Sequence, residues 1–391
     1  MRRMLAAVLA LLFLFAGCAR AAPPPGDEPP PAALARPEGY ARSLLDGEGR
    51  AAYDEMCSAA ESWRLGEEIP LSTPEKARTV RAAYDALLLD RPEFYWLRCE
   101  IPAGEQADRF ILGVEAGFSL ASVQERQKQI DEAACRLLAG LEGLSAPEAA
   151  VRAHDNLLKS LSYEEGAQDG DAGNLYGGLV RGKGVCGAYS RGYQYLMQRL
   201  GVPCAYLSGT SVRGIPHSWN AVKLDDGWYY VDATWDDLPD EKGYLYHDYL
   251  LVTFEEISLE HFSEPGQYST LPPGDSERYN YYRQYGYCAA LDAPDPVEAM
   301  AAGFARQLGD KELATVKRPV FLEIKLFGEY REFSRWRETY HREIFPVLRA
   351  ISDRLREENI PVEIDTTGYI EYNYNDNTQV LTLYPNASAT A

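Results

Sequence analysis

Two strand-like runs joined by a tight turn constrain the fold of this chain more than any other part of its sequence. Residues 217–224 form a strand-like run, residues 228–235 are rich in aromatic and β-branched side chains, and Asp225-Asp226-Gly227 lies between them. Strand-forming runs separated by a short Asp/Gly turn predict a β-hairpin. A turn this short can join only antiparallel neighbours, so we expect an antiparallel sheet in this region.

The register of this hairpin places a histidine beside an aspartate. If Leu224 pairs with Gly227, His217 lies opposite Thr234, and Asp232 lies two positions along on the same face. Diagonal neighbours of this kind are about 7–8 Å apart at the backbone, within reach of an imidazole–carboxylate hydrogen bond. The sequence therefore predicts that the side chains of His217 and Asp232 meet.

A cysteine stands at the predicted start of a helix. Gly184-Val185-Cys186-Gly187 precedes a run with apolar residues at helical spacing, and Gly201 and Pro203 end that run. In the first turn of a helix, unpaired backbone N–H groups and the helix dipole stabilise an anion, which lowers the pKa of a thiol. Because the thiolate is the reactive form, Cys186 is a candidate nucleophile. The alternative for a lone cysteine is to pack as a small buried hydrophobe.

These residues together make a candidate catalytic triad. Asp232 would orient the ring of His217, select its tautomer and stabilise its imidazolium form. A nucleophile on a helix start and a His–Asp pair on a hairpin form a Cys-His-Asp arrangement. His154 lies in a predicted amphipathic helix, where a hydrogen-bonded structural role is expected. The other histidines lack a paired acid at a convincing spacing: His247, His261 and His341.

Four motifs around these residues resemble those of the transglutaminase-like superfamily, in the same order along the chain. They are Gly184-Val185-Cys186-Gly187-Ala188-Tyr189, Leu200-Gly201-Val202-Pro203-Cys204-Ala205-Tyr206, His217-Ser218-Trp219-Asn220 and Gly227-Trp228-Tyr229-Tyr230-Val231-Asp232-Ala233-Thr234-Trp235. Upstream, His154-Asp155 and Leu161-Ser162-Tyr163 are similar to the segment that opens the bacterial domains of this superfamily.

The resemblance implies an α+β fold with a papain-like, or transglutaminase-like, core. In that core a helix bearing Cys186 packs on an antiparallel sheet bearing His217 and Asp232. Cys186 would be the nucleophile, His217 the general base and acid, and Asp232 the orienting residue, with a thioester that passes to water or to an amine. The backbone N–H of Cys186 is one expected oxyanion donor. Tyr176 is the candidate for a second donor, with Asn174 as the alternative.

The N-terminus has the pattern of an export signal. Arg2 and Arg3 precede an apolar run, residues 4–16, that is too short to span a bilayer comfortably. Leu14-Phe15-Ala16-Gly17-Cys18 resembles a bacterial lipobox, which implies cleavage before Cys18 and lipidation of its sulfur; an ordinary secretory signal with an incidental cysteine is the alternative. We therefore expect an extracytoplasmic lipoprotein, held at the bacterial cell surface by a membrane anchor at Cys18.

Composition excludes some classes of partner. The net charge of −20 argues against electrostatic binding to nucleic acid. The cysteines are scattered without a CxxC pair, which predicts neither a disulfide framework nor a zinc site. Asp236-Asp237 and Asp240-Glu241 are interpreted as parts of a solvated loop, because a calcium site needs about six or more oxygen ligands in a defined cage. We expect no metal and no cofactor.

The chain divides into five predicted segments: 1–17, a signal peptide; 18–40, the lipidated cysteine and a proline-rich tether; 41–148, an N-terminal α/β supporting domain; 149–290, the catalytic domain; and 291–391, a C-terminal α/β unit of β-α-β-β type. In the supporting domain we expect helices over 74–89 and 123–141 and strands over 94–97 and 109–112. In the C-terminal unit we expect a strand over 320–326, one helix over 333–355 with a kink near Pro346, and strands over 368–374 and 378–384.

Two classes of function remain open. The first is a cysteine enzyme that acts on amide bonds of a peptide or protein, by hydrolysis or by transfer to an amine; surface tethering favours a cell-wall peptide as substrate. The second is a catalytically silent module for binding or assembly at the cell surface. The complete triad favours the enzyme. A near match to a phosphate-binding loop at residues 177–184 is set aside, since Gly184 stands where Ser or Thr is needed.

Overall fold

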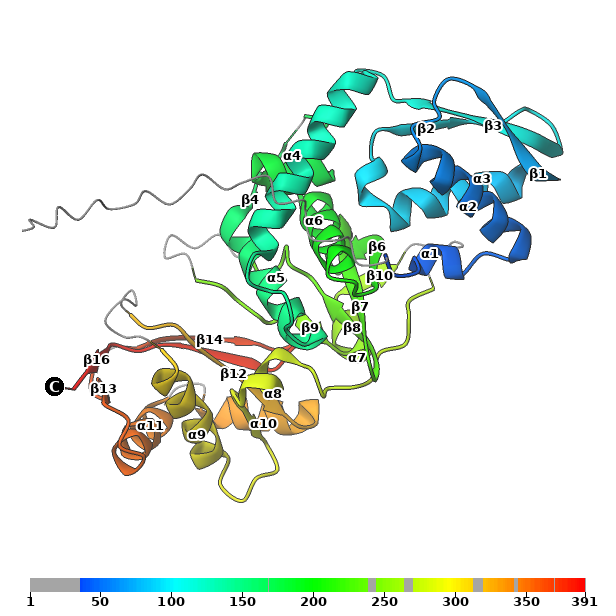
Figure 1. Ribbon diagram of the computed structural model, residues 1–391. Helices are drawn as coiled ribbons and strands as arrows, with labels where there is room; N and C mark the ends of the chain where they lie inside the picture. Colours follow the sequence, from blue (N-terminus) through cyan, green and yellow to red (C-terminus); the bar gives the residue numbers. More distant parts are fainter. Residues whose placement is uncertain are drawn as a thin grey trace, which may run out of the picture. The chain divides into compact units, whose positions relative to one another are not determined.

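A five-stranded antiparallel sheet with helices packed on it carries the residues that the sequence analysis singled out (Figure 1). The computed structural model describes residues 36–167, 169–237, 244–263, 270–311, 319–340, 344–368 and 370–390. In spatial order the strands of this central sheet are β10 (His261–Ser263), β6 (Cys204–Ser211), β7 (Pro216–Leu224), β8 (Gly227–Val231) and β9 (Leu250–Val252).

The predicted hairpin and its register are confirmed. Leu224 of β7 pairs with Gly227 of β8, and the ladder continues to Asn220 opposite Val231. β8 ends there, so Asp232 follows its last residue directly. β7 runs further and pairs with β6 on its other side, where His217 lies opposite Gly209. A side chain at Gly209 would come within 2.0 Å of the carbonyl oxygen of Phe262, so this glycine lets β10 approach β6.

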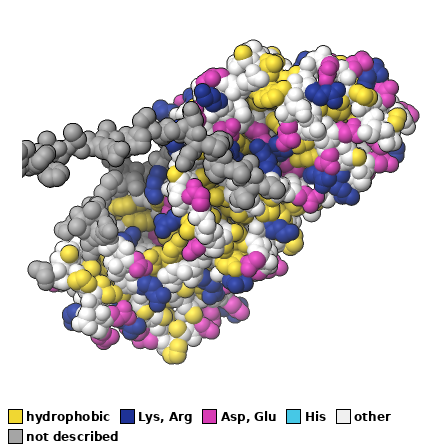
Figure 2. All heavy atoms as spheres, in the orientation of Figure 1, with side chains coloured by type: hydrophobic (Ala, Val, Ile, Leu, Met, Phe, Trp, Pro, Cys, Tyr) yellow, Lys and Arg dark blue, Asp and Glu magenta, His cyan; other side chains and the backbone are white. Residues whose placement is uncertain are grey.

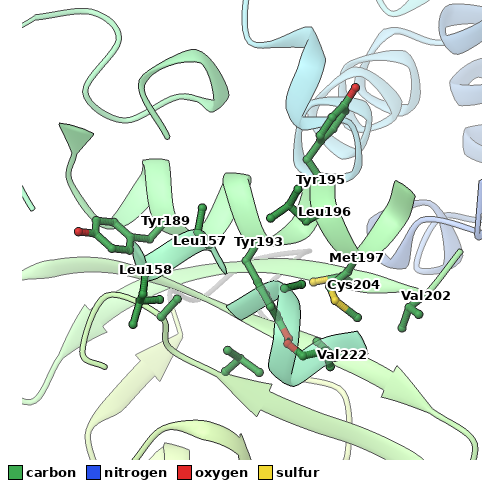
Figure 3. Close-up of a cluster of buried hydrophobic side chains, with 14 of the residues drawn as sticks. Leu157, Leu158, Tyr189, Tyr193, Tyr195, Leu196, Met197, Val202, Cys204 and Val222 are labelled. Atoms are coloured by element: carbon green, nitrogen blue, oxygen red, sulfur yellow. The ribbon is translucent and has the colours of Figure 1, made fainter. Parts of the chain in front are cut away.

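The helix α6 (Cys186–Arg199) begins where the sequence predicts, and the left-handed Gly201 (φ 76°) follows its end. It lies beside α5 (Ala146–Ser160), and both pack on the central sheet (Figure 1). Figure 3 shows their shared core, in which side chains of α6, α5, β6 and β7 meet. Fully buried members include Tyr193, Leu196 and Met197 of α6, Leu157 of α5 and Val222 of β7.

The chain before α5 forms a three-stranded antiparallel sheet with helices. The predicted strand over 94–97 is wrong, because Pro92–Phe94 is a 3-10 turn and the strand β2 begins only at Leu97. Pro92 fixes φ and lacks a donor, which suits the first turn of a helix. The elements are α1 (Tyr40–Ser43), α2 (Gly47–Glu61), β1 (Glu68–Lys76), α3 (Ala77–Asp90), β2 (Leu97–Glu100), β3 (Gln106–Val114) and α4 (Leu120–Leu138), with sheet order β1-β3-β2.

Between α5 and α6 the chain forms β4 (Ser162–Tyr163), a π-helical turn (Gly177–Arg181) and β5 (Lys183–Gly184). After β9 come α7 (Phe254–Ser258), β10 and α8 (Tyr281–Tyr285). The described part of the chain contains no helix that is both long enough and apolar enough to span a bilayer. Acidic and basic side chains interleave over the face shown in Figure 2, so the negative net charge does not gather into one patch there.

The C-terminal part forms a separate four-stranded mixed sheet with helices. The single kinked helix predicted over 333–355 is wrong: Pro346 stands at the first turn of a separate helix, a position that proline favours. The elements are β11 (Cys288–Ala290), α9 (Pro296–Gly309), β12 (Leu322–Phe327), α10 (Tyr330–Tyr340), α11 (Phe345–Glu357), β13 (Val362–Ile364), β14 (Glu371–Asn375), β15 (Val380–Tyr384) and β16 (Ala387–Ala389). The main sheet has the order β11-β12-β15-β14, and β13 pairs with β16.

Candidate active site

Cys186 is the first residue of α6 and is half-buried. The next residue, Gly187, touches the backbone of a neighbouring loop: a side chain there would lie 2.6 Å from the carbonyl oxygen of Gly173. This contact explains why glycine follows the cysteine. It also fixes the start of α6 against the segment that precedes it, so the position of the thiol is set by backbone packing.

His217 and Asp232 form the hydrogen bond that the hairpin register predicts. Nε2 of His217 lies 2.6 Å from Oδ2 of Asp232. The other oxygen of Asp232, Oδ1, accepts hydrogen bonds from the backbone N–H groups of Thr234, at 3.0 Å, and Trp235, at 3.3 Å. Since Nε2 of His217 is committed to the aspartate, its Nδ1 is the ring nitrogen available to the thiol of Cys186.

The electrostatics of the three groups favour a thiolate–imidazolium pair. Burial lowers the pKa of His217, but the charge and hydrogen bond of Asp232 and the contact with Cys186 outweigh it and raise that pKa to about 10. Burial likewise opposes ionisation of Asp232, yet the two imidazoles beside it hold its pKa well below the usual range. For Cys186, burial raises the thiol pKa, and hydrogen bonds and charge from His217, with further bonds from Ser218, lower it overall.

Cys186 differs in this respect from the other cysteines of the described chain. All six described cysteines, Cys186 included, are free thiols. Burial raises the pKa in four of them, to about 11 at Cys57 and about 12 at Cys99, and in the same direction at Cys204 and Cys288. The pKa of Cys186 is lowered whereas the pKa values of these four thiols are raised, so Cys186 is the one of the five whose thiolate is stabilised.

Polar contacts lock the helix of Cys186 to the strand of His217. The hydroxyl of Ser190 donates to the carbonyl oxygen of Cys186 at 2.9 Å and lies 3.1 Å from the hydroxyl of Ser218, which follows His217 in the chain. The side-chain amide of Asn220 donates to the carbonyl oxygens of Ser190, at 3.0 Å, and Ala205, at 3.1 Å. Sequence reasoning assigned no role to Ser190 or Ser218, because their meeting depends on how α6 crosses the sheet.

Aromatic rings surround the His–Asp pair. The ring of Trp235 stacks on His217 at a centroid distance of 5.4 Å, and Trp219 stacks on it at 6.2 Å. Trp219 is completely buried and Trp235 partly buried. The rings keep water from the back of the imidazole, which strengthens the bond between His217 and Asp232.

The two side chains considered as oxyanion donors have other partners. The hydroxyl of Tyr176 donates to the amide oxygen of Gln129 on α4 at 2.7 Å. The amide of Asn174 donates to Gly170 and Asp171 and accepts from the N–H of Gly177. An oxyanion role for Tyr176 or Asn174 stays a prediction, and these contacts disfavour it.

Two histidines are placed differently from the expectation. His261 was expected to lack an acid, but its Nε2 lies 2.8 Å from Oδ2 of Asp232. His247 was expected to lack one too, but it lies between Asp155, at 3.1 Å, and Glu323, at 2.9 Å. These acids are 29 residues away for His261, and 92 and 76 residues away for His247, so no local pattern reveals them.

The structure agrees with the prediction for His154 and contradicts the one for Asp236. His154 is fully buried beside Asp155 and Asp236, in agreement with a structural role. The interpretation of Asp236 as part of a solvated loop is wrong, because its side chain is fully buried and accepts from the N–H of Tyr249. Cys18, His341, Asp240 and Glu241 lie outside the described residues.

Two groups of side chains in the described chain have the spacing of metal ligands: His217, Asp232 and His261, and His154, Asp155 and His247. In both groups ring nitrogens lie 2.6–3.3 Å from carboxylate oxygens. Protons on the rings satisfy the same atoms that an ion would bind, so this geometry does not call for a metal.

Comparisons with known proteins agree with the geometry. A family model for the transglutaminase-like superfamily matches residues 135–233, a range that includes all three triad positions. The chain is 28% identical over 136 residues to the kyphoscoliosis peptidase of Homo sapiens and to that of Mus musculus; each match covers 29% of this chain and 21% of the relative. The chain thus spans about a fifth of the length of these curated relatives.

Among solved structures, a TGase crystal structure is similar at 14% identity and a TM-score of 0.28, over 37% of this chain and 45% of that one. The periplasmic domain of TgpA from Pseudomonas aeruginosa is similar at 12% identity and a TM-score of 0.21, over 36% and 63%. The family match together with the mixed helix–sheet fold leads to one conclusion: residues 135–233 form a domain of the transglutaminase-like superfamily.

Proposed function

We propose that this protein is a cysteine enzyme that cleaves or transfers acyl groups of amide bonds through a thioester on Cys186. The single observation that carries the proposal is the hydrogen bond of 2.6 Å between Nε2 of His217 and Oδ2 of Asp232, formed where His217 also lowers the pKa of the Cys186 thiol against the effect of burial. The lowered pKa of this one thiol supports it, as does membership of residues 135–233 in a superfamily that includes cysteine peptidases and acyltransferases.

The geometry supports the following reaction. The thiolate of Cys186 attacks the carbonyl carbon of the amide, and the backbone N–H of Cys186 would stabilise the oxyanion. The imidazolium of His217 gives a proton to the leaving amine as the C–N bond breaks, which leaves a thioester and a neutral ring. His217 then takes a proton from the incoming water or amine. Collapse of the second tetrahedral intermediate releases the product and restores the thiolate–imidazolium pair.

We further propose that this chemistry takes place outside the cytoplasm, on a substrate at the cell surface. The support is the sequence of the N-terminus: an apolar signal-like run, the lipobox-like residues before Cys18, and a proline-rich segment up to residue 40. A protein or a cell-wall peptide near the membrane would then be the available substrate.

A product assay tests the proposal. The full chain is incubated with a glutamine-containing peptide and a labelled primary amine, and the products are resolved by mass spectrometry. Peptide cleavage identifies a hydrolase, and amine incorporation identifies a transferase; either supports the proposal if Cys186→Ala abolishes it. Cys135→Ser is the matched control, because Cys135 is an exposed thiol on α4. Neither product, or equal product from Cys186→Ala, contradicts the proposal.

A further inference from the structure

His261 is a second imidazole on the triad carboxylate. It is the first residue of β10 and is 2% exposed. Its Nε2 lies 2.8 Å from Oδ2 of Asp232, the same oxygen that His217 binds at 2.6 Å. The rings of His217 and His261 are 5.4 Å apart. One carboxylate oxygen thus bridges two buried imidazoles.

The partners of His261 determine how many protons its ring carries. Nδ1 lies 3.1 Å from the carbonyl oxygen of Ile257, which can only accept, so Nδ1 carries a proton. Nε2 faces the oxygen of Asp232, so a proton must lie between those two atoms as well. Asp232 also accepts two backbone N–H bonds, which stabilise its ionised form, and this places the second proton on His261.

The surroundings of His261 suit a buried cation. Trp235, Trp219 and Tyr249 have ring centroids 4.5, 4.9 and 6.0 Å from it, within the range of cation–π attraction. The charged and titratable groups that face it are Asp232 and His217, and beyond the ring of Tyr249 lies Glu260, to which the Tyr249 hydroxyl donates.

We propose that His261 is a positioning residue of the active site: a doubly protonated imidazole that shares the carboxylate of Asp232 with His217. This inference rests on the proposed function of Cys186 and His217. His261 binds Oδ2 of the carboxylate, whereas the two backbone N–H groups bind Oδ1. Its charge balances that of Asp232, so the buried set of thiolate, two imidazoliums and carboxylate is neutral as a whole.

The added positive charge has a defined effect on the triad. It stabilises the thiolate of Cys186 and opposes the proton on His217, so it lowers both pKa values that bound the active pH range. Replacing His261 by glutamine keeps a donor for Asp232 but removes the charge. The pH at which alkylation of Cys186 reaches half of its maximal rate should then rise by about one unit, because the thiolate loses a stabilising charge.

The matched control is His247→Gln, which removes another buried imidazole held between two carboxylates, away from Cys186. The midpoint pH of Cys186 alkylation should keep its wild-type value in this control. A shift of the midpoint in His261→Gln alone supports the proposal, because a merely structural loss would lower the rate without moving the midpoint. An unmoved midpoint in His261→Gln, or an equal shift in both variants, contradicts it.

A direct measurement on the unmodified chain remains decisive even if His261→Gln fails to fold. Selective ¹⁵N-histidine labelling and NMR report the protonation of each ring nitrogen at neutral pH. Shifts of the protonated type at both nitrogens of His261 support the proposal, and a shift of the unprotonated type at either overturns it. A failure of the proposed function is separate: it would appear as an inert Cys186 in the wild-type chain.

Discussion

Asp232 shows how one carboxylate organises the candidate site. Its Oδ1 accepts two backbone N–H groups and its Oδ2 two imidazoles, so both oxygens are held in place. The contact with His217 could be predicted because both residues belong to one hairpin, whose register follows from the turn. The contact with His261 could not, because β10 reaches Asp232 only after the chain has passed through β9 and α7.

Replacement of Asp232 by asparagine tests how strongly this carboxylate controls the protonation of His217. Among the groups that raise the pKa of His217 to about 10, Asp232 contributes most. Asp232→Asn should therefore lower the pKa of His217, by at least about one unit. NMR titration of the His217 ring from pH 5 to 11 checks this; a pKa that stays in place contradicts the assigned role of the carboxylate.

The start of α6 is the element that places the nucleophile. Its position could be predicted, because glycines before the helix and Gly201 after it mark both ends. The contacts that hold the helix start in place could not be predicted, because they depend on tertiary packing. Gly187 touches the loop at Gly173, and Ser190 meets Ser218. The helices α10 and α11 also could not be told apart from the sequence, because their apolar residues follow one helical spacing and predicted a single helix.

Gly187→Ala tests whether the close backbone contact at Gly187 holds the start of α6. The added methyl group would lie 2.6 Å from a backbone oxygen, so the helix start must move. We expect a loss of about 1–3 kcal/mol in the free energy of unfolding and slower alkylation of Cys186. Gly173→Ala is the matched control, because a side chain there meets nothing within 4 Å. Urea denaturation and alkylation rates check both variants, and equal behaviour of the two contradicts the close-contact account.

Across the molecule, a buried charge network links the central sheet to the C-terminal layer. His247 lies between Asp155 of α5 and Glu323 of β12, and the ring of Tyr281 stacks on it at 3.9 Å. Burial lowers the pKa of His247, but these two carboxylates raise it to about 10. Sequence reasoning could not find this network, because its members come from three distant segments.

His247→Gln tests the network through stability. The folded pKa lies above the unfolded value of about 6.5, so the contribution of His247 is full below that pH and is lost as pH rises through about 10. Below pH 6.5 the variant should lose about 3 kcal/mol of unfolding free energy, because two buried carboxylates lose their partner. Denaturant titrations at pH 6 and pH 10 check this. A loss that is independent of pH contradicts it, and Arg356→Gln, at an exposed ion pair, serves as the control.

The central claim is that Cys186 is an activated nucleophile paired with His217. Its most direct test is the alkylation rate of each cysteine against pH, resolved by peptide mass spectrometry on the folded chain, with exposed Cys135 as an internal reference. We predict that Cys186 reacts fastest below pH 8.5, where an ordinary thiol is mostly protonated, and that His217→Ala removes this advantage. A Cys186 that is inert, or that reacts equally without His217, would contradict the claim.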